Sequence, residues 1–262
     1  MRFGLFSKLF VVTFILVYLA IMLPVIKVDN IAGILASATF LFGIFYGFEA
    51  AVVLQNYSQL KLLVSSESAG ILAIFHLSRI LPQDIASEME VKIEQYLIKA
   101  IHNPLSKYVN LTNKEFFAIF DPLKRAKSES DAESNAIQYL HESMYYLPQT
   151  RNQISQVAPR DVDPPEWAML IILGLIIITT LFLGRDTTIV SQLTAAIFSV
   201  TVIGSLLLLD EIDSNKIREE RLEFDVFNDT LIAMNKEKYY PKRAISNKMI
   251  SKDKLEGARI GD

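Results

Sequence analysis

Four apolar segments constrain this chain more than any other feature of its sequence. They run from Leu9 to Ile26, from Ile31 to about Leu54, from Trp167 to Gly184 and from Thr188 to Leu209. A transmembrane helix needs about 20 mainly apolar residues to cross a hydrocarbon core about 30 Å thick. The chain as a whole is 51% hydrophobic, with a mean hydropathy of +0.30. The sequence therefore predicts an all-α, multi-pass membrane protein with four transmembrane helices.

The first segment also has features of a signal peptide. Arg2 and Lys8 precede the apolar run, and the sequence Ala-Ser-Ala at 36–38 imitates a cleavage site. The run is longer than the apolar core of a signal peptide, which has about 7 to 15 residues, and the apparent cleavage site lies inside the second segment. We therefore expect the first segment to be kept as a transmembrane helix.

The positive charges predict how the chain crosses the membrane. Of the 26 Lys and Arg residues, 24 lie before the first segment, between the second and third, or after the fourth. The short connectors 27–30 and 185–187 carry one each. Because cytoplasmic loops are enriched in Lys and Arg, both termini and the central region are predicted to be cytoplasmic. The membrane would be the plasma membrane, which is the inner membrane in a bacterium.

This topology divides the chain into four parts. They are a first transmembrane hairpin at 1–54, a cytoplasmic helical region at 55–165, a second transmembrane hairpin at 166–209, and a cytoplasmic helix with a flexible basic tail at 210–262. No run of residues has a strand pattern.

Helical periodicity continues beyond the second apolar segment. From Gln55 to about Leu81 apolar residues recur at helical spacing, so the second transmembrane helix is expected to extend into the cytoplasm until Pro82 interrupts it. A further helix is expected between Pro82 and the sequence Asn-Pro at 103–104. Two capping-box patterns, which begin at Thr112 and Ser130, predict two more helix starts.

The sequence offers no anchor for catalysis. Cysteine is absent, and the three histidines, His76, His102 and His141, lack the spacing of metal ligands. No phosphate-binding glycine loop or nucleophile motif occurs. The net charge of −3 does not indicate a nucleic-acid-binding protein. We therefore expect a protein that is not an enzyme and has no cofactor or metal.

Two sides of the second predicted helix differ in composition. Small residues gather on one side, where Gly43 and Gly47 form a GxxxG pair that suits close packing against another helix. Another side combines bulky apolar and polar residues within an arc of about 80°. Its members, which we call the α-helical stripe, are Phe42, Phe45, Glu49, Val52 and Asn56. These five are the candidate pore-lining residues.

Glu49 is the unusual member of the stripe. An ionised side chain at the bilayer centre costs about 2.5 to 3.5 kcal/mol on insertion scales. Glu49 follows Ile31 by 18 residues, or about 27 Å of helix, which places it near the cytoplasmic edge of the hydrocarbon core. Two interpretations stay open there: the carboxylate reaches the headgroups, or it faces a water-filled vestibule or another helix.

Several short motifs give the chain a resemblance to a known family. They are SSESAG with Glu67, SRILP with Arg79 and Pro82, the position of Arg151, Trp167 at the entry to the third span, and LLLLDEID with Asp210. In these motifs the chain resembles the bestrophin-like domain family of four-span membrane proteins, over most of its length up to Asp210. The family commonly follows this Asp with a Pro-aromatic pair, whereas this chain has Glu-Ile-Asp. Glu67, Arg79, Arg151 and Asp210 are expected to be structural polar residues.

The resemblance also implies a function. Bestrophins are pentameric ion channels whose second transmembrane helix lines a pore with an apolar neck and extends into a cytoplasmic vestibule. The chain is accordingly expected to form a homo-oligomer, with five copies favoured, in contact with membrane lipid. Phe42 and Phe45 would form the neck, and Glu49 and Asn56 would face the vestibule. Because rings of carboxylates favour cations, the pore is expected to pass cations or to be weakly selective.

A membrane scaffold or assembly factor is the alternative function. Eight Lys or Arg residues lie between Lys236 and Arg259, and they would bind a cytoplasmic protein partner or anionic lipid. An intramembrane enzyme or transporter is less favoured, because no pair of residues at the centres of the spans suits acid–base, nucleophilic or ion-coupling chemistry.

Overall fold

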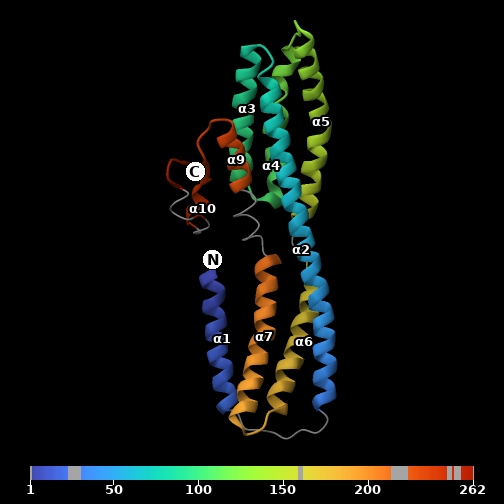
Figure 1. Ribbon diagram of the computed structural model, residues 1–262, viewed down its shortest axis with the longest axis vertical. Coiled ribbons are helices and arrows are strands. Elements are labelled where there is room, and N and C mark those ends of the chain that lie inside the picture. Colours follow the sequence, from blue (N-terminus) through green and yellow to red (C-terminus); the bar gives the residue numbers. More distant parts are fainter. Residues whose placement is uncertain are drawn as a thin grey trace. The chain divides into compact units, whose positions relative to one another are not determined.

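The fold is seen in a computed structural model that describes residues 2–22, 31–158, 162–213, 224–246, 250 and 255–261. Most of these residues are helical (Figure 1), which confirms the predicted all-α class. The elements are α1 (Arg2–Met22), α2 (Ile31–Ser78), α3 (Gln83–His102), α4 (Leu105–Ala118), the 3-10 helix η1 (Asp121–Arg125), α5 (Asp131–Val157), α6 (Pro164–Gly184), α7 (Ile189–Asp213), α9 (Asp225–Ala233), β1 (Tyr239–Pro241), α10 (Lys242–Ser246) and β2 (Arg259–Gly261).

Helix α2 is a single helix of 48 residues. It begins as the second apolar segment and continues past Gln55, as the periodicity predicts. The helix ends in a turn in which Leu81 N donates to Ser78 O at 3.1 Å, and Pro82 then takes the N-cap position of α3. Proline lacks an N–H group and disfavours helical backbone in the residue before it. The predicted interruption at Pro82 is therefore confirmed.

Three helices within the described ranges are long and apolar enough to cross a membrane, namely α2, α6 and α7. They coincide with the second, third and fourth apolar segments. Helix α1 covers the first segment as far as Met22, with a shorter apolar stretch from residue 10, and residues 23–26 of that segment lie outside the described residues. Large apolar side chains are exposed on these helices, among them Phe14 and Val190. Such a surface is rare in soluble proteins and fits a lipid environment.

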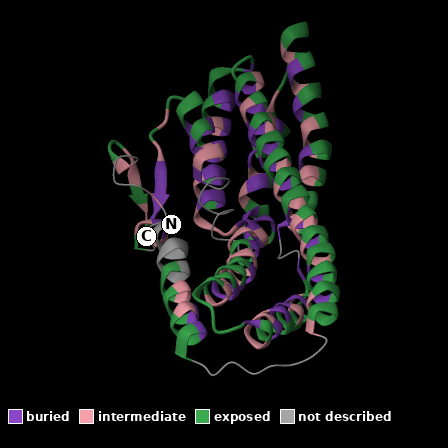
Figure 2. Cartoon of the chain, turned by 60° about the horizontal axis from the view of Figure 1, so that its bottom comes forward, coloured by how far each residue is buried: buried purple, intermediate pink, exposed green. Residues whose placement is uncertain are grey.

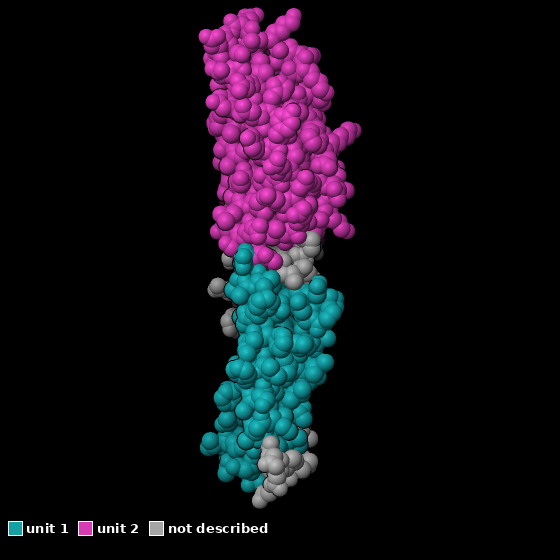
Figure 3. Space-filling model, turned by 90° about the vertical axis from the view of Figure 1, so that its right-hand side faces the viewer, with its two compact units in different colours: residues 1–55, 160–214 teal, residues 56–159, 215–262 magenta. Residues whose placement is uncertain are grey.

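Contacts between residues divide the chain into two compact units, which Figure 3 colours separately. Unit 1 comprises residues 1–55 and 160–214, with α1, the first half of α2, α6 and α7. Helix α7 packs against both α1 and α6. A Cβ atom on Gly174 of α6 would lie 3.3 Å from Val202 and 3.4 Å from Leu206 of α7, so the glycine permits a close helix contact. Small residues allow transmembrane helices to approach in this way.

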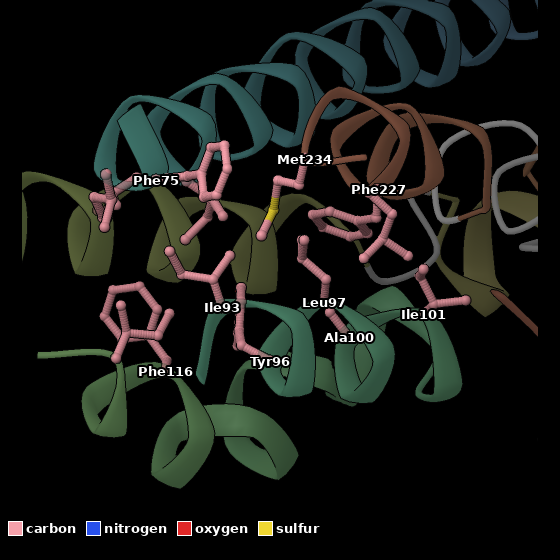
Figure 4. Close-up of a cluster of buried hydrophobic side chains, with 14 of the residues drawn as sticks. Phe75, Ile93, Tyr96, Leu97, Ala100, Ile101, Phe116, Phe227 and Met234 are labelled. Atoms are coloured by element: carbon pink, nitrogen blue, oxygen red, sulfur yellow. The ribbon is translucent and has the colours of Figure 1, made fainter. Parts of the chain in front are cut away.

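Unit 2 comprises residues 56–159 and 215–262, with the second half of α2 and with α3, α4, α5 and α9. Its helices each carry buried and exposed residues around their circumference (Figure 2), as amphipathic helices do. The buried sides meet in one cluster that includes Phe75, Ile93, Phe116 and Phe227 (Figure 4). A Cβ atom on Gly70 of α2 would come within 2.5 Å of a Leu147 methyl group of α5, so these two helices approach closely only because residue 70 is glycine.

The two predicted capping boxes had different outcomes. Ser130 caps α5, and its Oγ accepts a hydrogen bond from Glu133 N at 3.2 Å. The prediction at Thr112 was wrong, because α4 already begins at Leu105, directly after Pro104. Thr112 instead lies inside α4, where its hydroxyl donates to Tyr108 O at 2.7 Å. Proline in the position before a helix sets a start as well as a capping box does.

The C-terminal tail departs from the flexible segment that its sequence predicts. Tyr239–Pro241 is buried and pairs in parallel with Arg259–Gly261 as a two-stranded sheet. Asn228 of α9 holds the first strand, because its amide donates to Tyr239 O at 3.0 Å and accepts from Tyr239 N at 2.7 Å. The tail lacks the periodicity of a long helix, but ion pairs with α3 supply the contacts that order its described residues. Arg259 Nη1 lies 2.6 Å from Glu94 Oε1.

Candidate functional site

Helix α2 carries two buried carboxylates, Glu49 in unit 1 and Glu67 in unit 2. They are 18 residues apart, or about five helical turns, so they project from the same side of the helix. Glu49 is 5% exposed and Glu67 is fully buried. Because buried carboxylates are rare unless they are paired, each of these two residues marks a candidate site within its own unit.

Four of the five residues of the stripe belong to unit 1, and Asn56 is the first residue of unit 2. Phe42 is buried in a cluster with Leu170 and Val202, and its ring stacks on that of Tyr46 with 5.8 Å between centroids. Glu49 is buried as well. The other three members are partly buried, and they are Phe45, Val52 and Asn56. The helical arc therefore exists as expected, and its lining of a pore stays a prediction.

The small-residue side of α2 is open in the protomer. No atom outside the helix lies within 4 Å of where a Cβ on Gly43 or Gly47 would be. Both glycines are exposed. The close helix packing that the GxxxG pair predicts is therefore absent between the described residues of one protomer.

Glu49 has no hydrogen bond or ion pair with any residue that the structure describes. Its charged neighbours are carboxylates: Glu166, Asp163 and Asp213 all repel it electrostatically. Asp163 and Glu166 form a capping box at the start of α6, in which Asp163 N donates to Glu166 Oε2 at 2.9 Å. Among the described residues, no group of carboxylates and histidines is close enough to hold a metal ion. This end of unit 1 thus carries a cluster of acidic side chains.

Glu67 has the opposite surroundings. The hydroxyls of Tyr96 on α3 and Tyr108 on α4 donate to its two carboxylate oxygens. Arg151 of α5 places Nε 3.6 Å from Glu67 Oε1, so three helices supply partners to one carboxylate. Thr112 belongs to the same cluster, because its hydroxyl oxygen accepts a hydrogen bond from Arg151 Nη2 at 2.8 Å. We call these five residues the Glu67 cluster.

Arg151 makes cation–π contacts with aromatic rings as well as hydrogen bonds with oxygen atoms. Its guanidinium carbon lies 4.1 Å from the centroid of the Phe116 ring and 5.2 Å from that of Tyr96. Its Nη2 also donates to Val109 O at 3.2 Å, whereas Nε and Nη1 are buried without a hydrogen-bond partner in the described residues. Aromatic faces stabilise a desolvated cation by about 2 kcal/mol or more, which compensates in part for these unsatisfied donors.

Burial controls the proton equilibria of the Glu67 cluster. Burial raises the pKa of the Glu67 carboxyl, and the hydrogen bonds from Tyr108 and Tyr96 and the charge of Arg151 oppose that rise. Burial and the neighbouring Glu67 raise the pKa of Tyr96 and of Tyr108 well above the ordinary value. Both tyrosines therefore remain protonated donors at neutral pH. The cluster is a buried group of polar side chains from four helices, and a structural role for Glu67 and Arg151 stays a prediction.

The four family-pattern polar residues do not form one group. Glu67 and Arg151 meet in the Glu67 cluster, whereas Arg79 is exposed, with its guanidinium 5.7 Å from the ring centroid of Phe75. Arg79 therefore lies at the surface of the protomer and not in a buried polar contact. Asp210 is exposed near the end of α7. Sequence reasoning missed Tyr96, Tyr108 and Thr112, although a tyrosine within an apolar helical stripe, as Tyr96 is, indicates a buried partner for its hydroxyl.

Long apolar helices with exposed apolar side chains define the chain as a helical membrane protein. A family model described as the Bestrophin-like domain matches residues 7–214. The chain therefore belongs to the bestrophin-like family, as its motifs predict. The comparison with curated proteins gave no match, and the comparison with solved structures gave none.

Proposed function

We propose that this protein forms a homo-oligomeric ion channel in which α2 lines the pore, and that the pore passes cations. Membership of the bestrophin-like family supports the channel, and the unbroken α2 supplies a helix that is long enough to continue beyond the membrane. The observation that carries the cation preference is Glu49, a buried carboxylate near three others and without a hydrogen bond or ion pair in the described residues. Concentrated negative charge attracts cations and repels anions.

The five residues of the stripe have different places in this proposal. Phe45, Val52 and Asn56 are only partly buried in the protomer, so we assign them to the wall of the pore. Phe42 and Glu49 are buried against the helices of unit 1. From that position Phe42 fixes α2 against its neighbours, and Glu49 acts on ions through its charge. Electrostatic interactions act over several ångströms where the local dielectric constant is low.

Ion flux into liposomes tests the proposal. The purified full-length protein should conduct, and Glu49→Gln should lower the ratio of cation to anion permeability. Glu142→Gln, which removes a carboxylate from an exposed position of α5, is the matched control and should leave the ratio unchanged. Absence of flux from the wild-type protein, together with a monomeric particle in detergent, would remove the channel proposal.

The absence of cysteine from the chain allows the pore wall to be mapped one residue at a time. A positively charged thiol reagent should reduce the flux through Val52→Cys and Asn56→Cys. It should leave Gly47→Cys unaffected, because residue 47 lies on the opposite, small-residue side of α2. If Gly47→Cys is blocked and Val52→Cys is not, the pore lies on the other side of the helix.

The number of copies is part of the proposal. A ring of five is favoured by the resemblance to bestrophins, with lipid around it. The open space beside Gly43 and Gly47 leaves one side of α2 available to a helix of a neighbouring copy. Particle symmetry in detergent tests this directly, and a monomer or an open chain of copies would contradict it.

The alternative, a scaffold whose basic tail binds a protein partner or anionic lipid, has less support. Lys236 lies 2.6 Å from Glu90, and Arg259 lies 2.6 Å from Glu94, so two of the eight basic residues are already paired with α3. Replacing Lys248, Lys252 and Lys254 with Gln should abolish binding of the protein to anionic vesicles or to its partner if the scaffold is correct. Unchanged binding would count against it.

A further inference from the structure

We infer that unit 2 binds a small organic monocarboxylate in a pocket between the end of α2, the start of α3 and the turn after α9. The pocket has a volume of about 340 Å³, which is near the lower limit for small-molecule sites. Its lining residues, which include Arg79, Glu90 and Lys236, come from α2, α3 and the turn after α9. All of them belong to unit 2, so the inference does not depend on the channel.

Arg79 supplies the positive charge that a carboxylate would bind. Its guanidinium is exposed beside the pocket and lies 5.7 Å from the ring centroid of Phe75. Within the part of the chain that the structure describes, Arg79 has no ion pair. A guanidinium presents several N–H donors in a plane and binds a carboxylate through two parallel hydrogen bonds.

The other charges of the pocket cancel each other. Lys236 Nζ lies 2.6 Å from Glu90 Oε1, and it also lies 3.5 Å from Glu94 Oε2 just beyond the lining. The hydrogen bond to Glu90 raises the pKa of Lys236, so the ammonium stays charged and the pair stays neutral overall. Arg79 therefore leaves one net positive charge among the lining residues. A monoanion matches that charge, whereas Glu90 disfavours a second negative charge.

Apolar side chains form a minor part of the lining of the pocket, which is mostly polar. Phe75 and Met234 lie next to each other in the buried cluster (Figure 4), and Ala86 of α3 is buried beside the pocket. On α3, Gln83 Nε2 donates to Ser87 Oγ at 3.3 Å, which places a hydroxyl and an amide on the polar side. A small carboxylate would place its apolar body against these side chains and its charge at Arg79.

The backbone fixes the third wall of the pocket. Asn235 has a φ of 60°, and it follows α9 at a position where Lys236 N donates to Leu231 O at 2.8 Å and Asn235 N donates to Ile232 O at 2.8 Å. This is the usual left-handed ending of a helix, in which asparagine is tolerated. The turn holds Lys236 toward Glu90, so the site is formed before a ligand arrives.

Titration of the full-length protein in detergent with 4-fluorobenzoate, followed by fluorine NMR, tests the inference. The wild type should bind, and Arg79→Gln should raise the dissociation constant by about tenfold or more, the effect of one charge-assisted hydrogen-bonded pair. The dissociation constant of Arg79→Lys should lie between those of the wild type and Arg79→Gln, because lysine keeps the charge but cannot form the paired hydrogen bonds. Arg125→Gln removes an exposed arginine paired with Glu88 outside the pocket and should bind like the wild type.

Two further ligands distinguish recognition of a single negative charge at Arg79 from nonspecific binding to the protein surface. The neutral 4-fluorobenzamide and the doubly charged phenyl phosphate should each bind more weakly than 4-fluorobenzoate. Residue 79 is exposed, so Arg79→Gln should fold normally. An unchanged melting temperature without ligand verifies this. The inference is overturned if the wild type does not bind, if Arg79→Gln binds as well as the wild type, or if the amide binds as well as the carboxylate.

Discussion

Glu49 and Glu67 lie on the same side of the same helix, and both are buried, yet their surroundings are opposite. Glu67 accepts hydrogen bonds from two tyrosines and faces Arg151. Glu49 has three carboxylates as its charged neighbours and no hydrogen bond or ion pair among the described residues. Burial alone therefore does not describe the environment of a carboxylate. The polar partners distinguish the two residues, because a satisfied polar group stabilises a core and an unsatisfied one costs free energy.

Arg151→Leu should have the largest effect on stability. The substitution leaves Glu67 buried without its counter-charge, and breaking a buried ion pair from one side costs about 3 to 5 kcal/mol. Denaturant unfolding in detergent measures the loss. Arg125→Leu breaks an exposed pair with Glu88 and should cost less than about 1 kcal/mol. Equal losses of unfolding free energy in the two variants would show that the buried pair of Arg151 stabilises the fold no more than the exposed pair of Arg125.

The second largest effect should be the difference in unfolding free energy between Glu67→Gln and Glu49→Gln. The first weakens hydrogen bonds to a charged group and should cost about 1.5 to 3 kcal/mol in unfolding free energy. The second removes a repelled charge, so stability should stay within about 0.5 kcal/mol of the wild type or increase. Only the second should change ion selectivity. If both variants lose stability equally, the contrast between the two carboxylates fails.

Tyr96→Phe and Tyr108→Phe sharpen the comparison within the Glu67 cluster. Each removes one hydrogen bond to Glu67 and should lower the unfolding free energy by about 1 kcal/mol. The double variant should lose more than the sum of the single losses, because the second donor lost leaves the carboxylate with Arg151 alone. Tyr145→Phe, at an exposed position of α5, is the control and should have no measurable effect. Strictly additive losses would contradict this coupling.

The pH dependence should show the smallest effect. Folding raises the pKa of Glu67 above its ordinary value of 4.5, so the native state holds this proton more tightly than the unfolded state. The stability that this provides is present below pH 4.5 and is lost as pH rises through the folded pKa. The wild type should therefore lose stability relative to Glu67→Gln as pH increases above 4.5. A difference that is constant with pH would contradict the direction of the shift.

Local patterns predicted much of the fold. The interruption at Pro82 and the cap at Ser130 follow from backbone chemistry that acts within a few residues. The start of α4 was missed because two signals competed there, Pro104 and the pattern at Thr112, and the proline prevailed. The order in the tail was missed because its contacts reach α3, more than 140 residues earlier in the chain, through Lys236 and Arg259.

The apolar segments, the continuous α2, the family and the helical arc that joins Phe42 to Asn56 can be read from the chain alone. Each depends on composition, on short motifs or on the fixed angle between residues of one helix. The contact of Glu67 with Arg151, a residue 84 positions later, and the lack of a partner for Glu49 in the described residues are visible only in the folded protein. A helical pattern gives the angles between side chains, but which neighbour faces each side depends on how other helices pack.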